Sequence, residues 1–109
     1  MQHFDDRNSL NETMVQSVVD QIIALCQPVR ILLFSYKRYP NGEPSSFKLA
    51  VIAPFTDKGQ TEQDIYLGID SEISFDVLLY TEEEWQMLCK NPRSFAHQIL
   101  QMGTVIYGC

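Results

Sequence analysis

Hydroxyl and basic side chains gather between two apolar segments of the chain. Ser35, Lys37 and Arg38 follow the apolar run at 29–34, and Lys48 lies within the next run, at 47–53. Hydroxyl, ammonium and guanidinium groups donate hydrogen bonds to phosphate oxygens, so these four residues could bind a phosphate without a metal. The same residues equally fit a solvated loop that happens to be basic.

The elements that would position these side chains can be read from periodicity. The S-x-x-E pattern at 9–12 is a capping box, and helical apolar spacing then predicts a helix over 10–27. The segments 29–34, 47–53 and 74–80 are short, apolar and rich in β-branched or aromatic residues, which predicts three strands. Proline, asparagine and glycine between the first two indicate a loop over about 35–46.

The C-terminal half adds further helices. Thr81 to Glu84 forms a second capping box, and Pro92 is placed to end that helix and begin another. Gly103 is placed to end the last helix, and 104–107 can form a short terminal strand. Residues 56–70 fit either a strand or a short helix. The predicted fold class is a small α+β domain, with a mixed sheet of three or four strands covered by helices.

Composition limits the function classes. The 109 residues suffice for one domain spanning 1–109, with residues 1–8 as a frayed tail. The net charge of −6 disfavours a nucleic-acid partner. Three cysteines without C-x-x-C spacing disfavour a disulfide framework and a zinc site. The chain has no signal-like start and no long apolar run, so we expect a soluble, cytoplasmic protein without a membrane partner.

Several segments in this order resemble the minimal nucleotidyltransferase (MNT) family of the polymerase-β-like superfamily. They are ILLF, SYKR, LAVI, FDVLLYT, EEEW, PRSFAH and GTVIYG, and they span most of the chain. In that family a strand ends in Phe-Gly-Ser, and the Gly-Ser opens a short helix that holds a nucleotide triphosphate. An Asp-x-Asp pair and a third carboxylate bind two magnesium ions. The resemblance therefore implies a nucleotidyltransferase-like fold.

The family-equivalent positions are Ser35, Ser46, Lys48 and Asp76, and the chain departs from the motif in three places. The glycine before Ser35 is absent, and the two aspartate positions hold Ser46 and Lys48. Magnesium needs anionic oxygen ligands, whereas a lysine in this position would repel the metal. Only Asp76 remains as a metal ligand, so we expect no metal, no cofactor and no catalytic residue. We also expect Lys48 to contact Asp76, in the place of the metal charge.

The resemblance implies a pseudoenzyme that acts through protein interaction, and the first partner class to test is an all-helical HEPN protein, with this chain as the antitoxin-like half of a toxin–antitoxin pair. A homodimer is the other protein partner that we consider. One alternative is an active enzyme using magnesium and ATP, with displaced acids such as Glu43, Asp70 or Glu72 brought to Asp76. The other alternative is a regulatory module that binds a nucleotide or phosphate without metal, through Ser35, Lys37, Arg38 and Lys48.

Overall fold

The computed structural model describes the backbone of residues 6–108 and the side chains of residues 13–108. Four helices and four strands follow in the order α1 (Asp6–Cys26), β1 (Arg30–Arg38), β2 (Pro44–Ile52), α2 (Lys58–Gly68), β3 (Ser74–Tyr80), α3 (Glu82–Cys89), α4 (Phe95–Met102) and β4 (Thr104–Tyr107). The predicted α+β class with a mixed sheet is confirmed. Of the predicted frayed tail, residues 1–5 lie outside the described part and residues 6–8 belong to α1.

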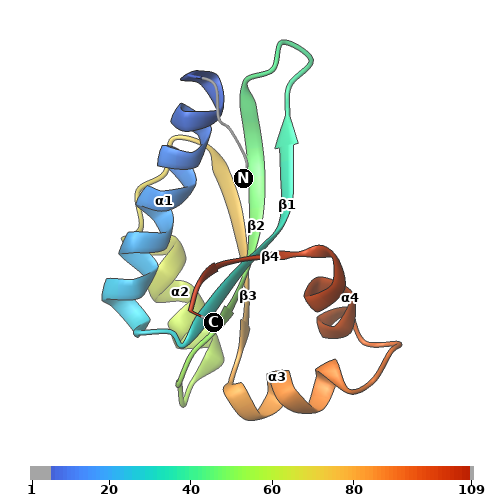
Figure 1. Cartoon of the computed structure of the whole chain (residues 1–109). Coiled ribbons are helices and arrows are strands. Elements are labelled where there is room, and N and C mark those ends of the chain that lie inside the picture. The colour runs from blue at the N-terminus through green and yellow to red at the C-terminus, as the bar shows by residue number, and fades with distance from the viewer. Residues whose placement is uncertain (1–5, 109) are drawn as a thin grey trace.

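The sheet has the strand order β3-β2-β1-β4 (Figure 1). β1 is antiparallel to both β2 and β4, whereas β2 and β3 are parallel and are joined through α2. β2 is therefore a central strand that carries Ser46 and Lys48, and its neighbours β1 and β3 carry Ser35 and Asp76. β3 and the short β4 form the two edges of the sheet.

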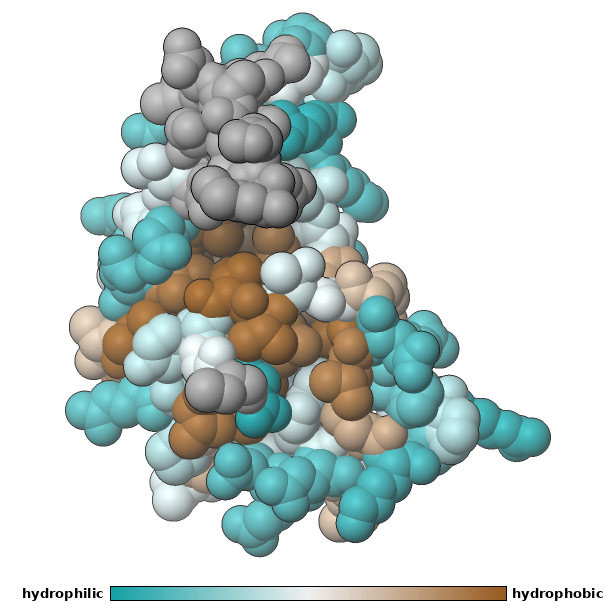
Figure 2. Space-filling model, viewed as in Figure 1, coloured by the Kyte–Doolittle hydropathy of each residue, from teal (hydrophilic) through white to brown (hydrophobic). Residues whose placement is uncertain are grey.

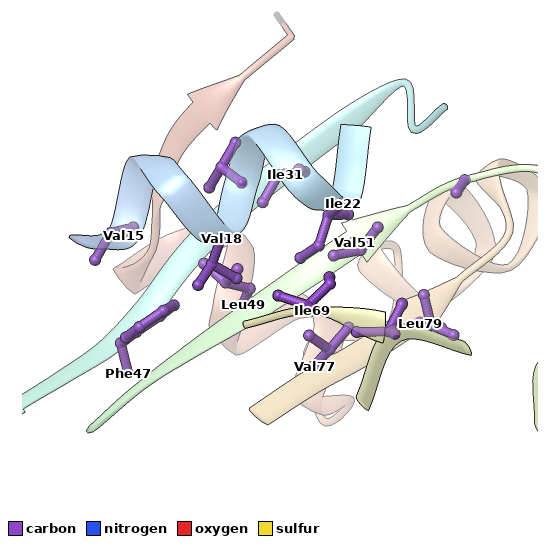
Figure 3. Close-up of a cluster of buried hydrophobic side chains, with 13 residues drawn as sticks. Val15, Val18, Ile22, Ile31, Phe47, Leu49, Val51, Ile69, Val77 and Leu79 are labelled. Atoms are coloured by element: carbon purple, nitrogen blue, oxygen red, sulfur yellow. The ribbon is translucent and has the colours of Figure 1, made fainter. Parts of the chain in front are cut away.

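One face of the sheet is covered by α1 and α2. Phe47, Leu49 and Val51 alternate along β2 and point to this face, where they are fully buried. Figure 3 shows them beneath Val18 and Ile22 of α1. Burial of such side chains stabilises a fold by about 1.5–3 kcal/mol each, so this layer is the main core.

The opposite face is apolar over only part of its length. Ala50 and Ile52 of β2 pack with Trp85 of α3 and with Ala96 and Ile99 of α4. Figure 1 shows α3 and α4 beside one end of the sheet, while the hairpin of β1 and β2 extends past them. Ser46 and Lys48, the next residues back along β2 on this face, are only half-buried.

Capping signals correctly located some helix ends. Thr81 accepts from the Glu84 amide, and Glu84 accepts from the Thr81 amide, so the second predicted capping box is confirmed. Gly103 follows the last residue of α4, as predicted. The ambiguous segment 56–70 is largely helical, because Asp57 caps α2 by accepting from Gln60 N at 3.0 Å.

Two predicted helix starts are wrong. α1 already begins at Asp6, so position 9 is inside the helix rather than at its start. α4 begins at Phe95, where Ser94 is the N-cap and accepts from His97 N at 3.1 Å. Pro92 instead lies in the turn between α3 and α4. A serine that accepts from the third residue of the helix satisfies an otherwise unpaired amide, and this outweighed the proline signal.

The loop predicted over 35–46 is also largely wrong, because β1 and β2 extend through most of it. The connecting turn spans only 39–43, where Tyr39 N donates to Glu43 O at 2.8 Å. Gly42 has a φ of 90°, and Asn41 Oδ1 accepts from Glu43 N at 2.9 Å. The asparagine–glycine pair thus makes a tight hairpin, and Pro44 is tolerated because it is the first residue of its strand.

The surface differs between the two ends of the sheet. Figure 2 shows apolar surface around the middle of the view, beside β4, whereas the end of the hairpin and the outer turns of α3 are hydrophilic. The hairpin end therefore presents a polar surface (Figure 2).

Within the described residues, no helix combines the length and apolar character required to cross a membrane.

Candidate functional site

Three of the four family-equivalent positions form one row across the sheet. Ser35 of β1 pairs in register with Lys48 of β2, and Lys48 pairs in register with Asp76 of β3. Lys48 and Asp76 each precede, by two residues, a side chain of the α3–α4 cluster, Ala50 and Leu78. Because side chains alternate along a strand, the row lies on the α3–α4 face. Ser35 and Lys48 are half-buried, whereas Asp76 is exposed.

A one-residue bulge in β1 places Ser35 in this row. Leu33 pairs with Leu49 and Ser35 with Lys48, so Phe34 is the extra residue. Phe34 and Ser35 therefore share the α3–α4 face, where the rings of Phe34 and Phe95 pack edge to face with their centroids 5.6 Å apart. A bulge changes the phase of alternation by one residue. In an unbulged strand, Ser35 would point toward α1.

A second polar row lies beside the first, toward the hairpin. Lys37 of β1 pairs with Ser46 of β2, and Ser46 pairs with Ser74 of β3. All four family-equivalent positions, Ser35, Ser46, Lys48 and Asp76, are thus on one face. Sequence reasoning missed Ser74, because only the parallel register of β2 and β3 reveals that it neighbours Ser46.

The predicted Lys48–Asp76 contact is wrong as an ion pair. The two residues occupy matching positions on neighbouring strands, but no salt bridge joins these two described side chains. Asp76 is exposed on an edge strand, so water can solvate its carboxylate. An exposed ion pair contributes only about 0–1 kcal/mol, so neither side chain is held to the other.

The acids considered as replacement metal ligands do not gather around Asp76. Asp70 lies in the loop after α2, where its amide donates to Gln21 Oε1 of α1 at 3.0 Å. Glu72 lies in the same loop, beside α1, which covers the opposite face of the sheet. Glu43 lies in the hairpin turn. Among the described residues, no three His, Cys, Asp or Glu side chains are grouped closely enough to hold a metal ion.

The predicted phosphate-binding set is divided between the two faces of the sheet. Ser35, Lys37 and Lys48 share the α3–α4 face, as their register shows. Arg38 instead lies over the ring of Tyr36, with its guanidinium carbon 5.1 Å from the ring centroid. Tyr36 packs against the α1–α2 cluster, so Arg38 belongs to the other face. Two cations, not three, can therefore approach one ligand on the polar face.

The backbone at Ser35 also departs from what the resemblance implies. The family has a short helix opening at this serine, but here β1 continues through Ser35 to Arg38. A helix N-terminus presents several backbone N–H groups to a phosphate, and a strand does not. The departure accompanies the missing glycine, since Phe34 takes the position before Ser35.

Behind the polar row, on the α1–α2 face, four aromatic rings stack across the sheet. Tyr36, Phe47, Phe75 and Tyr66 follow one another with centroid separations of 6.5, 5.9 and 5.7 Å. The Tyr66 hydroxyl accepts from Val77 N at 2.7 Å and donates to Val77 O at 3.4 Å. Tyr66 of α2 thereby caps the outer side of β3, a role that the ambiguous sequence signal at 56–70 did not reveal.

The pKa of Tyr66 reflects its burial, its hydrogen bond with the backbone of β3 and the acidic side chains near it. Burial raises the pKa of its phenol above the usual value, the hydrogen bond from Val77 opposes that rise, and the charges of Asp76 and Glu62 add to it. A neutral hydroxyl is therefore maintained where the strand needs both a donor and an acceptor. Asp76 thus influences the aromatic side of the sheet through its charge.

The polar face combines hydroxyl groups, two ammonium groups and one carboxylate, without a set of carboxylates that could bind two metal ions. Such a surface can bind anionic groups or a protein, and it does not supply the ligands of metal-dependent phosphoryl transfer. Comparisons of the chain with protein-family models, with curated proteins and with solved structures found no significant match.

Proposed function

We propose that the chain is a nucleotidyltransferase-like domain without metal-dependent transfer activity, which works by binding a protein partner. An all-helical HEPN protein is the first candidate, and the chain would act as its antitoxin-like half. Without adenylylation chemistry, the domain would act by masking a surface of that partner. The fold assignment rests on the sequence resemblance, together with the four-stranded mixed sheet.

The observation that carries the proposal is the convergence of the four family-equivalent positions on one face. Ser35, Ser46, Lys48 and Asp76 were assigned from motif spacing, yet they occupy adjacent register positions on three strands. A nucleotidyltransferase site requires this arrangement, because both metal ions must contact carboxylates from neighbouring strands. The convergence supports a site of that ancestry.

The residues at those positions argue against catalysis. Asp76 is the single carboxylate in the two polar rows, and Lys48 is its register neighbour. Two-metal catalysis needs several anionic ligands to offset the charge of the ions, and an adjacent ammonium opposes metal binding. A metal-free anion site is a second candidate, favoured by the shared face of Ser35, Lys37 and Lys48.

Calorimetric titration with ATP, with and without magnesium, tests the proposal. We expect the wild-type chain to show no magnesium-dependent binding, because its site has one carboxylate. ATP binding that is equal with and without magnesium would establish the anion site instead. Magnesium-dependent binding by the wild-type chain would refute the loss of the metal site.

A gain-of-binding variant makes the same experiment sharper. Ser46→Asp combined with Lys48→Asp adds two carboxylates beside Asp76, so we expect magnesium binding to appear. Gln86→Glu combined with Lys90→Glu is the matched control, because it makes the same change of net charge at exposed positions of α3 and its C-cap. Magnesium binding by both double variants, or by neither, would contradict the assignment of the site.

The partner is tested by co-expression with the product of a neighbouring gene that encodes an all-helical protein. We expect the two chains to copurify and the complex to lose the partner's toxicity. Binding that leaves the toxicity unchanged would contradict masking.

A further inference from the structure

We propose that the outer edge of β1 over residues 34–38 binds an extended, acidic segment of a protein partner, which joins the sheet as an added strand. This inference rests on the proposed protein-interaction role and deepens it, because it names the surface and the chemistry of the segment. The segment would be a loop or tail of the partner, so it is compatible with a partner whose body is helical.

The edge is available because β4 covers only the first part of β1. β4 pairs with Ile31, Leu33 and the residue between them, whereas β1 continues to Arg38. Within the described part of the chain, no strand pairs with the outer side of β1 at residues 34–38. Five residues of strand extend for about 17 Å, which is sufficient for a short added strand. Exposed strand edges of this kind are templates for pairing with another chain.

The other edge of the sheet, β3, is closed to an added strand by a side chain. At the middle of β3, the amide and carbonyl of Val77 are both hydrogen-bonded to the Tyr66 hydroxyl. A side chain of α2 therefore occupies the place that an added strand would need on β3. The end of β1 next to the hairpin has no such cap among the interactions described for residues 34–37.

Charge identifies the kind of segment that fits this edge. Positions 34–48 carry Lys37, Arg38 and Lys48 but one acid, Glu43, although the whole chain has a net charge of −6. Lys37 lies on the polar face and Arg38 on the aromatic face, so an added strand would meet a cation on each side. Successive acidic residues of that strand would point to opposite faces and toward these two cations. The hairpin end is hydrophilic, as Figure 2 shows.

The same charges argue against a second copy of this chain as the occupant. Two β1 edges paired with each other would bring both copies of Lys37 and Arg38 together, and like charges across a strand pair are destabilising. An acidic segment turns each of these repulsions into an attraction.

An apolar position is expected where the segment approaches β4. The ring of Phe95 is 46% exposed and touches the half-buried Phe34 at the bulge. An apolar side chain of the added strand would pack against this pair, since aromatic surfaces at strand edges favour such contacts. The preferred segment is thus acidic near the hairpin and apolar near β4.

Titration of the isotope-labelled full chain with synthetic peptides, followed by NMR, tests the inference. The probe is acetyl-Thr-Glu-Glu-Val-Thr-Val-Leu-amide, whose adjacent glutamates would point to opposite faces of the added strand, and its counterpart carries lysine in place of both glutamates. We expect the acidic peptide to shift the backbone amide signals of residues 34–38 and to slow their hydrogen exchange. We expect the lysine peptide to bind about tenfold more weakly, as two lost and reversed cross-strand charge pairs predict.

Two variants separate a charge effect from a loss of structure. Lys37→Glu should weaken binding of the acidic peptide about fivefold, whereas Lys90→Glu, which changes another exposed lysine, at the end of α3, should leave it unchanged. Equal binding of both peptides, or peptide-induced shifts confined to residues outside 34–38, would overturn the inference. Shifts of the same amides on raising the protein concentration alone would also overturn it, in favour of a second copy.

These outcomes are distinct from those of the proposed function. Magnesium-dependent ATP binding would refute the non-catalytic role whatever the peptides do. Copurification of a partner that leaves the amides of residues 34–38 unaffected would refute only the binding edge.

Discussion

Two rows of side chains, one residue apart on the same three strands, have opposite characters. One row is Tyr36, Phe47 and Phe75 on the α1–α2 face, and the other is Ser35, Lys48 and Asp76 on the α3–α4 face. Phe47 is fully buried between stacked rings, whereas its neighbour Lys48 has no ion pair with Asp76. Alternate positions of the same strands therefore face the aromatic core and the polar surface. We therefore expect substitutions in the polar row to cost less stability than substitutions in the aromatic row.

The largest expected difference between the rows comes from truncating their central residues. Phe47→Ala should lower the free energy of unfolding by about 3–5 kcal/mol, because it leaves a cavity between Tyr36 and Phe75. Lys48→Ala should change it by less than about 0.5 kcal/mol. Urea unfolding of the two variants measures both values, and similar losses would break the comparison.

A smaller effect is expected at the end of the aromatic row. Tyr66→Phe retains the ring that stacks on Phe75 but removes the hydroxyl bonded to Val77. The buried Val77 amide would lose its partner, so we expect a loss of about 1–2 kcal/mol. Urea unfolding gives the loss, and hydrogen exchange at Val77 should become faster. An unchanged exchange rate would mean that the hydroxyl does not cap β3.

The same tyrosines predict how stability depends on alkaline pH. Burial raises the pKa of Tyr36, Tyr66 and Tyr80 above 10.0, the value of an unperturbed phenol. The unfolded chain therefore loses these protons first, and the folded chain retains them. This contribution to stability is fully present below pH 10 and is lost as the pH rises through the folded pKa values. Unfolding measured across this range should show a shallower decline for Tyr66→Phe than for the wild-type chain.

The smallest expected effect is the coupling between Lys48 and Asp76. A double-mutant cycle with Lys48→Met and Asp76→Asn should give an interaction free energy below about 0.5 kcal/mol, because no salt bridge joins the two groups. The cycle is measured by urea unfolding of the four chains at low and high salt. A coupling above about 1 kcal/mol that falls with added salt would show that the pair forms in solution.

The elements with strong local signals were predicted closely. The strand predicted over 74–80 is β3, because an apolar run bounded by a polar loop and a capping box leaves few alternatives. The hairpin was predicted much less well, since Pro40 and Pro44 led to the prediction of a long loop. Asn41 and Gly42 make a tight turn that allows the strands to extend to Arg38 and Pro44.

The residues of the candidate site were predicted from the sequence, but the directions and contacts of their side chains were not. Motif spacing chose Ser35, Ser46, Lys48 and Asp76, and all four lie on one face. Spacing could not reveal that Arg38 turns to the other face over Tyr36, because a loop was predicted there and only a strand that continues to Arg38 makes Lys37 and Arg38 alternate between faces. Nor could it decide between an ion pair and two separately solvated charges, since both share the same backbone register.

The bulge at Phe34 decides which face of the sheet each later residue of β1 occupies. Phe34 has no partner of its own on β2, and this extra residue shifts the alternation of all later β1 residues by one position. Deletion of Phe34 would move Ser35 to the aromatic side and Tyr36 to the polar side. The β1 members of both rows would then exchange faces. Length changes before position 35 should therefore be tolerated far less than substitutions at position 35 itself.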